Sequence, residues 1–212
     1  MHAAPPDPSG SAAAAGDFPG GFPAPLRASA IRKSYAEGAL VFKMGSRTHS
    51  VFYVESGRVR LLRFGRAGEE VVLHDARRGD FFAEASLDST RYHCDAVASE
   101  PAVLLQVPAD ALKALLASDP EFVREWVGLL GRQLRAARAR LERLSLKGAR
   151  ERVLHLLLSE GRGPRSELVL AGTLKDLARE LGLTHEVLYR TLAALKSEGL
   201  IERDERALRL AR

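Results

Sequence analysis

The stretch TLKDLARELGLTHEVLYRTLAALKSEGLI, residues 173–201, decides the fold of the C-terminal part of the chain. Thr173 is a good helix N-cap, because its hydroxyl can accept a hydrogen bond from the free backbone N–H groups of the first turn and Asp176 follows three positions later. Leu177 and Leu181 then lie four residues apart on one face. This pattern predicts a short amphipathic helix that begins after Thr173.

A second helix follows after a tight turn. Gly182 supplies the left-handed backbone position that such a turn needs, and Thr184 caps a helix at about residues 184–197. The apolar face of this helix consists of Val187, Leu188, Leu192 and Leu195. Two helices joined in this way form a helix-turn-helix, whose second helix enters the major groove of DNA.

The opposite face of the second helix is polar. Its candidate base-reading residues are His185, Glu186, Tyr189 and Arg190. Arg190 can pair bidentately with guanine, and Glu186, four residues earlier on the same face, can accept from cytosine while it holds the arginine in place. The alternative for this pair is a solvent-exposed salt bridge within the helix. Candidate phosphate contacts, which set register but not specificity, are Thr173, Lys175, Thr184, Lys196, Arg203 and Arg206.

The segment after the second helix predicts a β-hairpin. Gly199 ends the helix, and residues 201–210 alternate in polarity around Asp204 and Glu205. A helix-turn-helix followed by a hairpin is a winged module. An ordinary helical hairpin would share the amphipathic pattern and the glycine, but it would have no reason to be followed by a short basic wing.

Composition limits the class of protein. The chain has 212 residues, 46% of them apolar, and a net charge of +5. Residues 1–120 carry 13 basic and 14 acidic side chains, whereas residues 121–212 carry 19 and 13, so the basic excess favours a phosphate-backbone partner for the C-terminal half. The single cysteine, Cys94, excludes an intramolecular disulfide and a cysteine-only metal site within one chain.

The N-terminus, MHAAPPDPSGSAAAAGDFPGGFPAP, has prolines and aspartates where a signal peptide would need a charged start and an apolar core. No run of 18 apolar residues occurs either. We therefore expect a disordered tail over residues 1–26, a cytoplasmic protein and no membrane partner.

Residues 34–108 consist of short alternating runs separated by glycines, such as SVFYVESGRVRLLRFG. Strands at this spacing predict an antiparallel β-roll or barrel. The glycines expected at its turns are Gly38, Gly45, Gly57, Gly68 and Gly79.

A long helix follows. Ser118, Asp119, Pro120 and Glu121 form a strong start signal, with a cap, a proline in the first turn and acidic side chains where the helix dipole favours them. Apolar residues then recur at spacings of four and three: Val123, Val127, Leu130, Leu134, Ala137, Leu141 and Leu144. This 3.5-residue period favours a coiled-coil dimer, since a helix that packs only on its own domain shows a broader stripe of period 3.6. Near the helix start the stripe widens with Phe122, Trp126 and Leu129, where we expect the helix to cover its own β-domain.

The order of these parts, together with the motifs RGDFFAEASL, SLKGARERVL and ELGLTHEVLYRTL, resembles the CRP/FNR family of bacterial transcription regulators over residues 31–212. The resemblance implies an α+β chain with four parts. These are a tail (1–26), an effector-sensing antiparallel β-roll of the cyclic-nucleotide-binding jelly-roll type (27–118), a dimerisation helix (119–146) and a winged helix-turn-helix (147–212). It also implies a homodimer on a palindromic operator of double-stranded DNA, with RNA polymerase as a further partner if the protein is an activator.

The FFAEASL segment, residues 81–87, resembles the phosphate-binding cassette of that family. The implied effector-binding residues are Ala83, Glu84, Ala85, Ser86, Leu87, Arg91, Tyr92 and His93. Cyclic-nucleotide-binding members begin the cassette with Gly-Glu and follow it with Arg-Ser or Arg-Thr, whereas this chain has Ala83-Glu84 and later Arg91-Tyr92. Because a buried phosphate needs a matched cation and hydroxyl, we expect a small effector other than cyclic AMP, with a cyclic nucleotide left open. Glu84 can equally be a simple helix-start residue.

Other classes of function are weaker. His93 and Cys94 could serve a haem or a redox sensor of the same fold, but adjacent strand residues point to opposite faces. No metal site and no catalytic residues are predicted, since His49, His74 and His93 are scattered and no nucleophile elbow, P-loop or dinucleotide motif occurs. A dimeric sensor or adaptor without DNA binding remains an alternative, against which the Glu186 and Arg190 pair argues.

Overall fold

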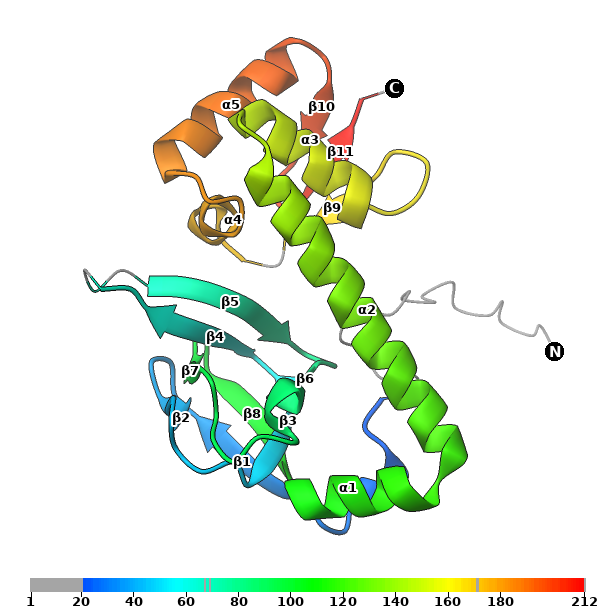
Figure 1. Ribbon diagram of the computed structural model, residues 1–212. Helices are drawn as coiled ribbons and strands as arrows, with labels where there is room; N and C mark the ends of the chain where they lie inside the picture. The colour runs from blue at the N-terminus through cyan, green and yellow to red at the C-terminus, as the bar shows by residue number, and fades with distance from the viewer. Residues whose placement is uncertain (1–20, 67, 69, 171, 212) are drawn as a thin grey trace, which may run out of the picture. The chain divides into compact units, whose positions relative to one another are not determined.

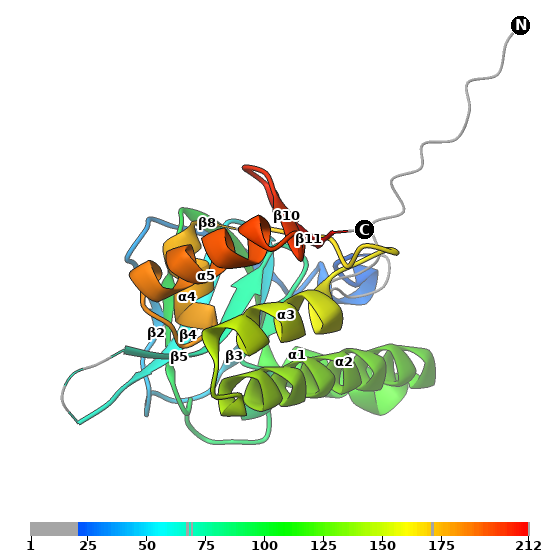
Figure 2. The ribbon, with the colours of Figure 1, turned by 90° about the horizontal axis from the view of Figure 1, so that it is seen from above.

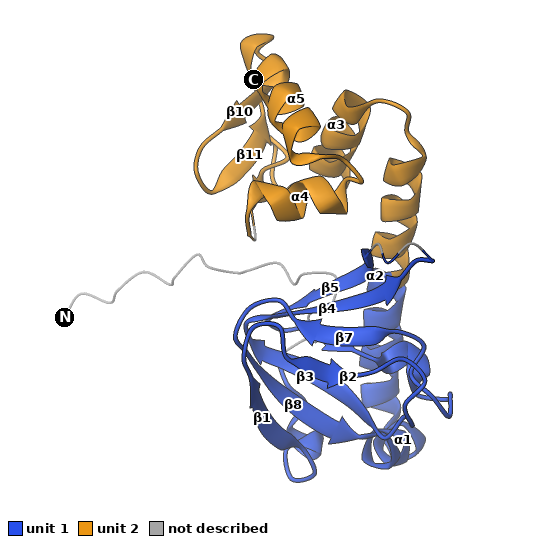
Figure 3. Ribbon diagram, turned by 90° about the vertical axis from the view of Figure 1, so that its left-hand side faces the viewer, with its two compact units in different colours: residues 1–133 blue, residues 134–212 orange. Residues whose placement is uncertain are grey.

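The structure is a computed structural model, and it describes residues 21–66, 68, 70–170 and 172–211. The chain divides into two compact units, residues 1–133 and residues 134–212, with the division inside the long helix (Figure 3). The expected tail over residues 1–20 lies outside the described residues. No helix among the described residues is long and apolar enough to cross a membrane.

The first unit contains two four-stranded antiparallel sheets among its described residues (Figure 1). One has the order β1 (Ile31–Tyr35), β8 (Ala102–Pro108), β3 (Ser50–Ser56) and β6 (Phe81–Phe82). The other has the order β2 (Leu40–Phe42), β7 (Asp95–Ala98), β4 (Arg58–Phe64) and β5 (Glu70–Arg77). The antiparallel β-roll expected from the alternating runs is confirmed.

Gly57 alone links β3 to β4. Its φ is +78°, and a Cβ atom placed there would lie 2.1 Å from the carbonyl oxygen of Pro101. Only glycine fits this position, because both the backbone conformation and the space exclude a side chain. The turn predicted at Gly57 therefore needs glycine, because the backbone of Pro101 and Ala102, at the start of β8, lies against it.

The interior of the roll is aromatic. Phe42, Phe52, Phe82 and Tyr92 form one buried cluster, in which the rings of Phe42 and Tyr92 stack with centroids 3.9 Å apart. A second cluster lies where α1 (Ala109–Ser118) packs on β3 and β8. It includes Phe122, Trp126 and Leu129 from the start of α2 (Pro120–Ser145), as predicted from the widened stripe.

The N-terminal boundary of the roll differs from the prediction. Phe22 and Leu26 are buried in the second cluster, and residues 24–26 form the short helix η1 (Ala24–Leu26). The expectation of a disordered tail up to residue 26 was therefore wrong for its last residues. Two isolated apolar side chains among prolines have no periodicity, so only tertiary packing reveals their role.

The second unit is a three-helix module with a small sheet. Beyond the end of α2 it contains α3 (Ala149–Glu160), α4 (Leu174–Glu180) and α5 (His185–Ser197). The strands β10 (Ile201–Arg203) and β11 (Ala207–Leu210) form the predicted hairpin, visible beyond the end of α5 in Figure 2. A third strand, β9 (Leu168–Val169), pairs with β11 and was not predicted. The apolar faces of α3, α4 and α5 form one core with Ile201 and Leu208.

Candidate nucleic-acid interface and effector cassette

The helix-turn-helix forms as its sequence predicts. Thr173 and Asp176 form a reciprocal capping box at the start of α4, with N–H to oxygen distances of 3.0 and 3.3 Å. The Thr184 hydroxyl accepts from the Val187 N–H at 3.2 Å and caps α5. Gly182 between them has a φ of +63°. Each helix start is therefore fixed by its own side chains, which sets where α5 begins relative to α4.

One face of α5 is buried and the other is exposed. Leu188, Leu192 and Leu195 are buried in the core of the module. The four predicted base-reading residues are all exposed: His185, Glu186, Tyr189 and Arg190. The apolar packing of α5 thus turns these side chains outward together.

Glu186 and Arg190 lie one helical turn apart. Within the described part of the chain they form no ion pair with each other or with another residue. The alternative interpretation, a salt bridge between Glu186 and Arg190 within the helix, is therefore not found in this structure. Both groups keep their full hydrogen-bonding capacity toward a partner outside the chain.

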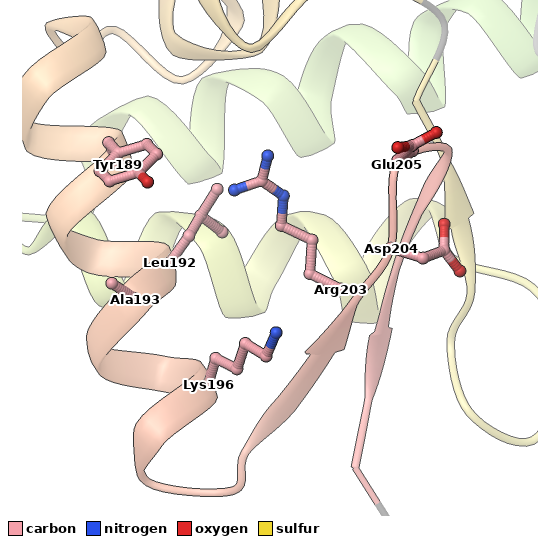
Figure 4. A pocket seen from close by; sticks show the side chains of 7 residues that line it. All are labelled: Tyr189, Leu192, Ala193, Lys196, Arg203, Asp204 and Glu205. Atoms are coloured by element: carbon pink, nitrogen blue, oxygen red, sulfur yellow. The ribbon is translucent and has the colours of Figure 1, made fainter.

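A groove of about 390 Å³ runs between α5 and the hairpin. Figure 4 shows the side chains of Lys196 and Arg203 extending into it, one from the helix and one from β10. Its lining residues are Tyr189, Leu192, Ala193, Lys196, Arg203, Asp204 and Glu205. Lys196 and Arg203 could bind an anion such as a DNA phosphate here, whereas Asp204 and Glu205 in the same lining carry the opposite charge.

The hairpin turn is held by Asp204. Its Oδ1 accepts from the N–H groups of Arg206 and Ala207, both at 2.8 Å, and its carboxylate also pairs with Arg209. These contacts, the Arg206 N–H first, lower the pKa of Asp204. The turn consequently leaves the Arg206 side chain exposed at the tip of the wing.

The other predicted phosphate contacts differ in availability. Lys175 and Lys196 are exposed, and Arg203 is half-buried against the groove. Thr173 and Thr184 are exposed, but their hydroxyls already cap helices. The Thr173 hydroxyl already donates a hydrogen bond to Asp176 at 2.8 Å, whereas the Thr184 hydroxyl could still donate one to a phosphate.

The candidate effector cassette begins on a strained residue. Ala83 has a φ of +67°, in the left-handed region that glycine adopts without cost. The helix η2 (Glu84–Ser86) follows directly. An alanine in this conformation costs roughly 1–2 kcal/mol, although its buried methyl group recovers part of this by packing.

The Glu84 side chain is half-buried, with its Oε2 atom fully out of solvent. Its Oε2 has no hydrogen-bond partner among the described residues. Burial, and to a lesser extent the nearby charge of Asp80, raises the pKa of Glu84 to about 7. The carboxyl therefore titrates near neutral pH, and a further negative charge beside its ionised form would be unfavourable.

The structure brings only some of the predicted effector residues together. Ser86 is buried and its hydroxyl lies 2.8 Å from Nδ1 of His93, so these two form a pair. Arg91 is exposed and donates to the Gly45 carbonyl at 2.5 Å. Tyr92 is 1% exposed, and its hydroxyl donates to the Ser50 carbonyl at 2.8 Å. Tyr92 is therefore a core residue, whereas Ala85 and Leu87 remain at the surface or half-buried.

His93 and Cys94 were expected on opposite faces of a strand, but both lie in the bend before β7 (Asp95–Ala98), so strand alternation does not apply to them. His93 is exposed and Cys94 is 2% exposed. Burial raises the pKa of the Cys94 thiol to about 11, so the thiol stays protonated and poorly reactive at neutral pH. Among the described residues, no group of three or more histidine, cysteine or acidic side chains could hold a metal ion.

The predicted seam of α2 is an exposed apolar stripe. Val127, Leu134 and Leu141 are 60%, 51% and 68% exposed. Leu130, Ala137 and Leu144 are also exposed, and Val123 is half-buried. Seven apolar positions along one helix face thus remain largely uncovered by the described residues.

Sequence reasoning missed the arginines at the end of α2 and in α3. Arg143 is buried, and Arg152 donates to four backbone carbonyls. Their partners lie far along the chain or on the backbone, so spacing alone gives no signal for them.

Known proteins match both parts of the chain. The family model of the cyclic nucleotide-binding domain matches residues 32–119, and that of the Crp-like helix-turn-helix domain matches residues 151–212. The cyclic AMP receptor protein of Thermus thermophilus is 33% identical over 174 residues, which cover 80% of this chain and 79% of that protein.

Two further similarities agree with this match. Electron transport regulator A of Shewanella oneidensis is 25% identical over 81% of this chain and 71% of that protein. The solved structure of FixK2 from Bradyrhizobium japonicum shares the fold, with a TM-score of 0.68 and 24% identity over 86% of this chain and 93% of that one.

Proposed function

Because the chain belongs to the CRP/FNR family of DNA-binding transcription regulators, we propose that it acts as a homodimer that reads a palindromic operator through α5. The observation that carries this proposal is the exposed face of α5, where Glu186 and Arg190 have no ion-pair partner among the described residues. We propose no catalytic role, since the relatives are regulators.

Base reading falls to the N-terminal part of α5. The Arg190 guanidinium can donate two hydrogen bonds to O6 and N7 of guanine, and the Glu186 carboxylate can accept from N4 of cytosine. His185 and Tyr189 lie on the same exposed face, with ring centroids 6.4 Å apart. These neighbours would contact the flanking bases and so set the preference of each half-site.

Phosphate binding falls to the surrounding cations. Lys196 and Arg203 face each other across the groove between α5 and the hairpin (Figure 4). A DNA strand beside the major groove would place a phosphate there, while Lys175, Arg206, Thr173 and Thr184 could hold neighbouring phosphates. These contacts would orient α5 without adding sequence information.

Dimerisation would cover the seam of α2. A coiled coil buries apolar side chains that recur every 3.5 residues, and the exposed seam has this period. Two winged modules related by a twofold axis would read half-sites about one helical turn apart. The palindromic operator follows from that symmetry.

The effector is proposed to be a small molecule other than cyclic AMP that binds at the cassette. The Thermus relative is named for cyclic AMP. Here, however, Arg91 is the sole lysine or arginine between residues 83 and 93, and its guanidinium already donates to Gly45. A cyclic phosphate beside Glu84 would have Arg91 as its cation in this stretch, without the serine or threonine that follows the arginine in cyclic-nucleotide-binding members, so a neutral or cationic ligand suits this cassette better.

Redox or haem sensing is not proposed for this chain. The buried Cys94 and the exposed His93 do not form one iron site. The Cys94 thiol is also a poor redox sensor, because burial keeps it protonated. The cytoplasm as location, and RNA polymerase as a partner if the protein is an activator, belong to the same proposal.

The test of base reading compares two single variants on a binding site and its single-base changes. Arg190→Ala should weaken operator binding by about 1–3 kcal/mol and remove discrimination at one base pair of each half-site. Lys196→Ala, on the same helix, should weaken all sequences alike and reduce the salt dependence. Equal weakening of all sequences by Arg190→Ala would make Arg190 a phosphate contact and contradict the assignment.

A further inference from the structure

Arg143 lies in the last turn of α2 and is 1% exposed. Its Nη1 lies 2.7 Å from Oε1 of Glu160, and its Nη2 lies 3.7 Å from Oε1 of Glu180. Glu160 is the last residue of α3 and Glu180 the last residue of α4. One guanidinium therefore joins three helices at the point where two of them end, and the negative ends of those helix dipoles favour a cation there.

Arg152 forms a second connection in the same unit. Its guanidinium donates to the carbonyls of Leu144 and Leu146 at the end of α2, at 3.3 and 2.9 Å. It also donates to the carbonyls of Leu181 and Gly182 in the turn before α5, at 3.0 and 3.2 Å. The end of the long helix is thus tied to the turn that positions α5.

Stability alone does not explain a buried arginine. An ion pair out of water gains little over well-packed apolar side chains of the same volume, because desolvation offsets the attraction. What the arrangement adds is geometry, since the directional 2.7 Å hydrogen bond fixes the end of α3 against α2 and the 3.7 Å charge contact to Glu180 keeps the end of α4 nearby.

The same turn of α2 carries the seam. Leu141 and Leu144 flank Arg143 in sequence and are exposed, whereas Arg143 points into its own module. Residues 134–145 of α2 also belong to the compact unit that contains α5. The seam and α5 are therefore connected within one unit through Arg143.

We propose that Arg143 is a positioning residue that locks the end of α2 to α3 and α4, so that the dimer seam sets the distance between the two recognition helices. Arg152 supports the same connection. This inference rests on the proposed dimeric function. In this proposal Arg143 determines the preferred spacing between half-sites without contacting DNA.

The test is Arg143→Met, with Arg135→Met as the matched control at an exposed position of the same helix. Each full-length protein selects from duplexes that carry two half-sites separated by spacers of different length. Wild type and Arg135→Met should enrich one spacing. Arg143→Met should enrich the same half-site sequence, but its preference for that spacing over one longer by a base pair should fall by about fivefold or more.

If circular dichroism shows that Arg143→Met does not fold, the triple variant Arg143→Met with Glu160→Gln and Glu180→Gln is tested in its place. The triple variant removes the carboxylates together with the arginine, so no unpaired charge is left. Arg143→Lys, which keeps the charge without the fork, should restore the spacing preference only in part. A folded variant without Arg143 that keeps the wild-type spacing preference overturns the inference alone. Failure of wild type to enrich any paired half-sites overturns the proposed function and this inference with it.

Discussion

The Glu84 carboxyl lies in a site where burial disfavours its charged form. Its pKa rises from 4.5 to about 7, because burial penalises the charged form and Asp80 lies nearby. Between these two pH values the folded chain holds a proton that the unfolded chain has released. The folded state is therefore favoured on the acid side of this window.

We expect the free energy of unfolding to fall as pH rises from 4.5 to about 7, by roughly 1–3 kcal/mol from this group. Glu84→Gln should remove this change and stabilise the fold above the window, whereas Glu37→Gln, at an exposed position, should leave the change in place. Urea unfolding of the three proteins at pH 5 and pH 8 measures it. An unchanged pH dependence in Glu84→Gln would show that the carboxyl is solvated.

Single residues were predictable where one local rule decides them. The caps Thr173 and Thr184 follow from their side-chain oxygens. The different burial of His93 and Cys94 does not follow from strand alternation, because both residues precede β7. Tyr92 was not predictable as a core residue, since its stacking on Phe42 and its bonds to Ser50 join segments more than 40 residues apart.

At the scale of elements, periodicity predicted the helices and most strands, because each buries one face. The strands β6 and β9 contain two residues each, too few for any period, and exist because neighbouring strands hold them. The start of α2 follows from its cap, in which Oδ1 of Asp119 accepts from the Glu121 and Phe122 N–H groups at 3.0 Å.

The seam of α2 yields a prediction about assembly. Leu134→Asn with Leu141→Asn should shift the protein from dimer to monomer at micromolar concentration, since polar groups would replace apolar contacts at the centre of a coiled coil. Leu158→Asn on α3 is the control, because Leu158 is as exposed, at 66%, but lies outside the seam. Sedimentation velocity distinguishes the dimer from the monomer. A double variant that remains dimeric and binds DNA as before would refute the seam.

At the scale of the whole molecule, the order of parts follows from local patterns, and their boundaries follow from packing. Phe22 and Leu26 belong to the β-roll because they fill the space beside Phe81 and Trp126. The two compact units meet within α2, although the sequence marks no break there. The start of this helix packs on the roll through Phe122 and Trp126, and its last turn carries Arg143, which pairs with Glu160 and Glu180.

The most direct measurement is selection of random DNA duplexes by the purified wild-type protein, followed by sequencing, with and without cyclic AMP and cyclic GMP. The account predicts a palindrome whose half-sites lie about one helical turn apart and whose enrichment does not depend on either nucleotide. Enrichment only with a cyclic nucleotide would contradict the assignment of the cassette, and no enriched sequence under any condition would contradict the reading of bases by α5.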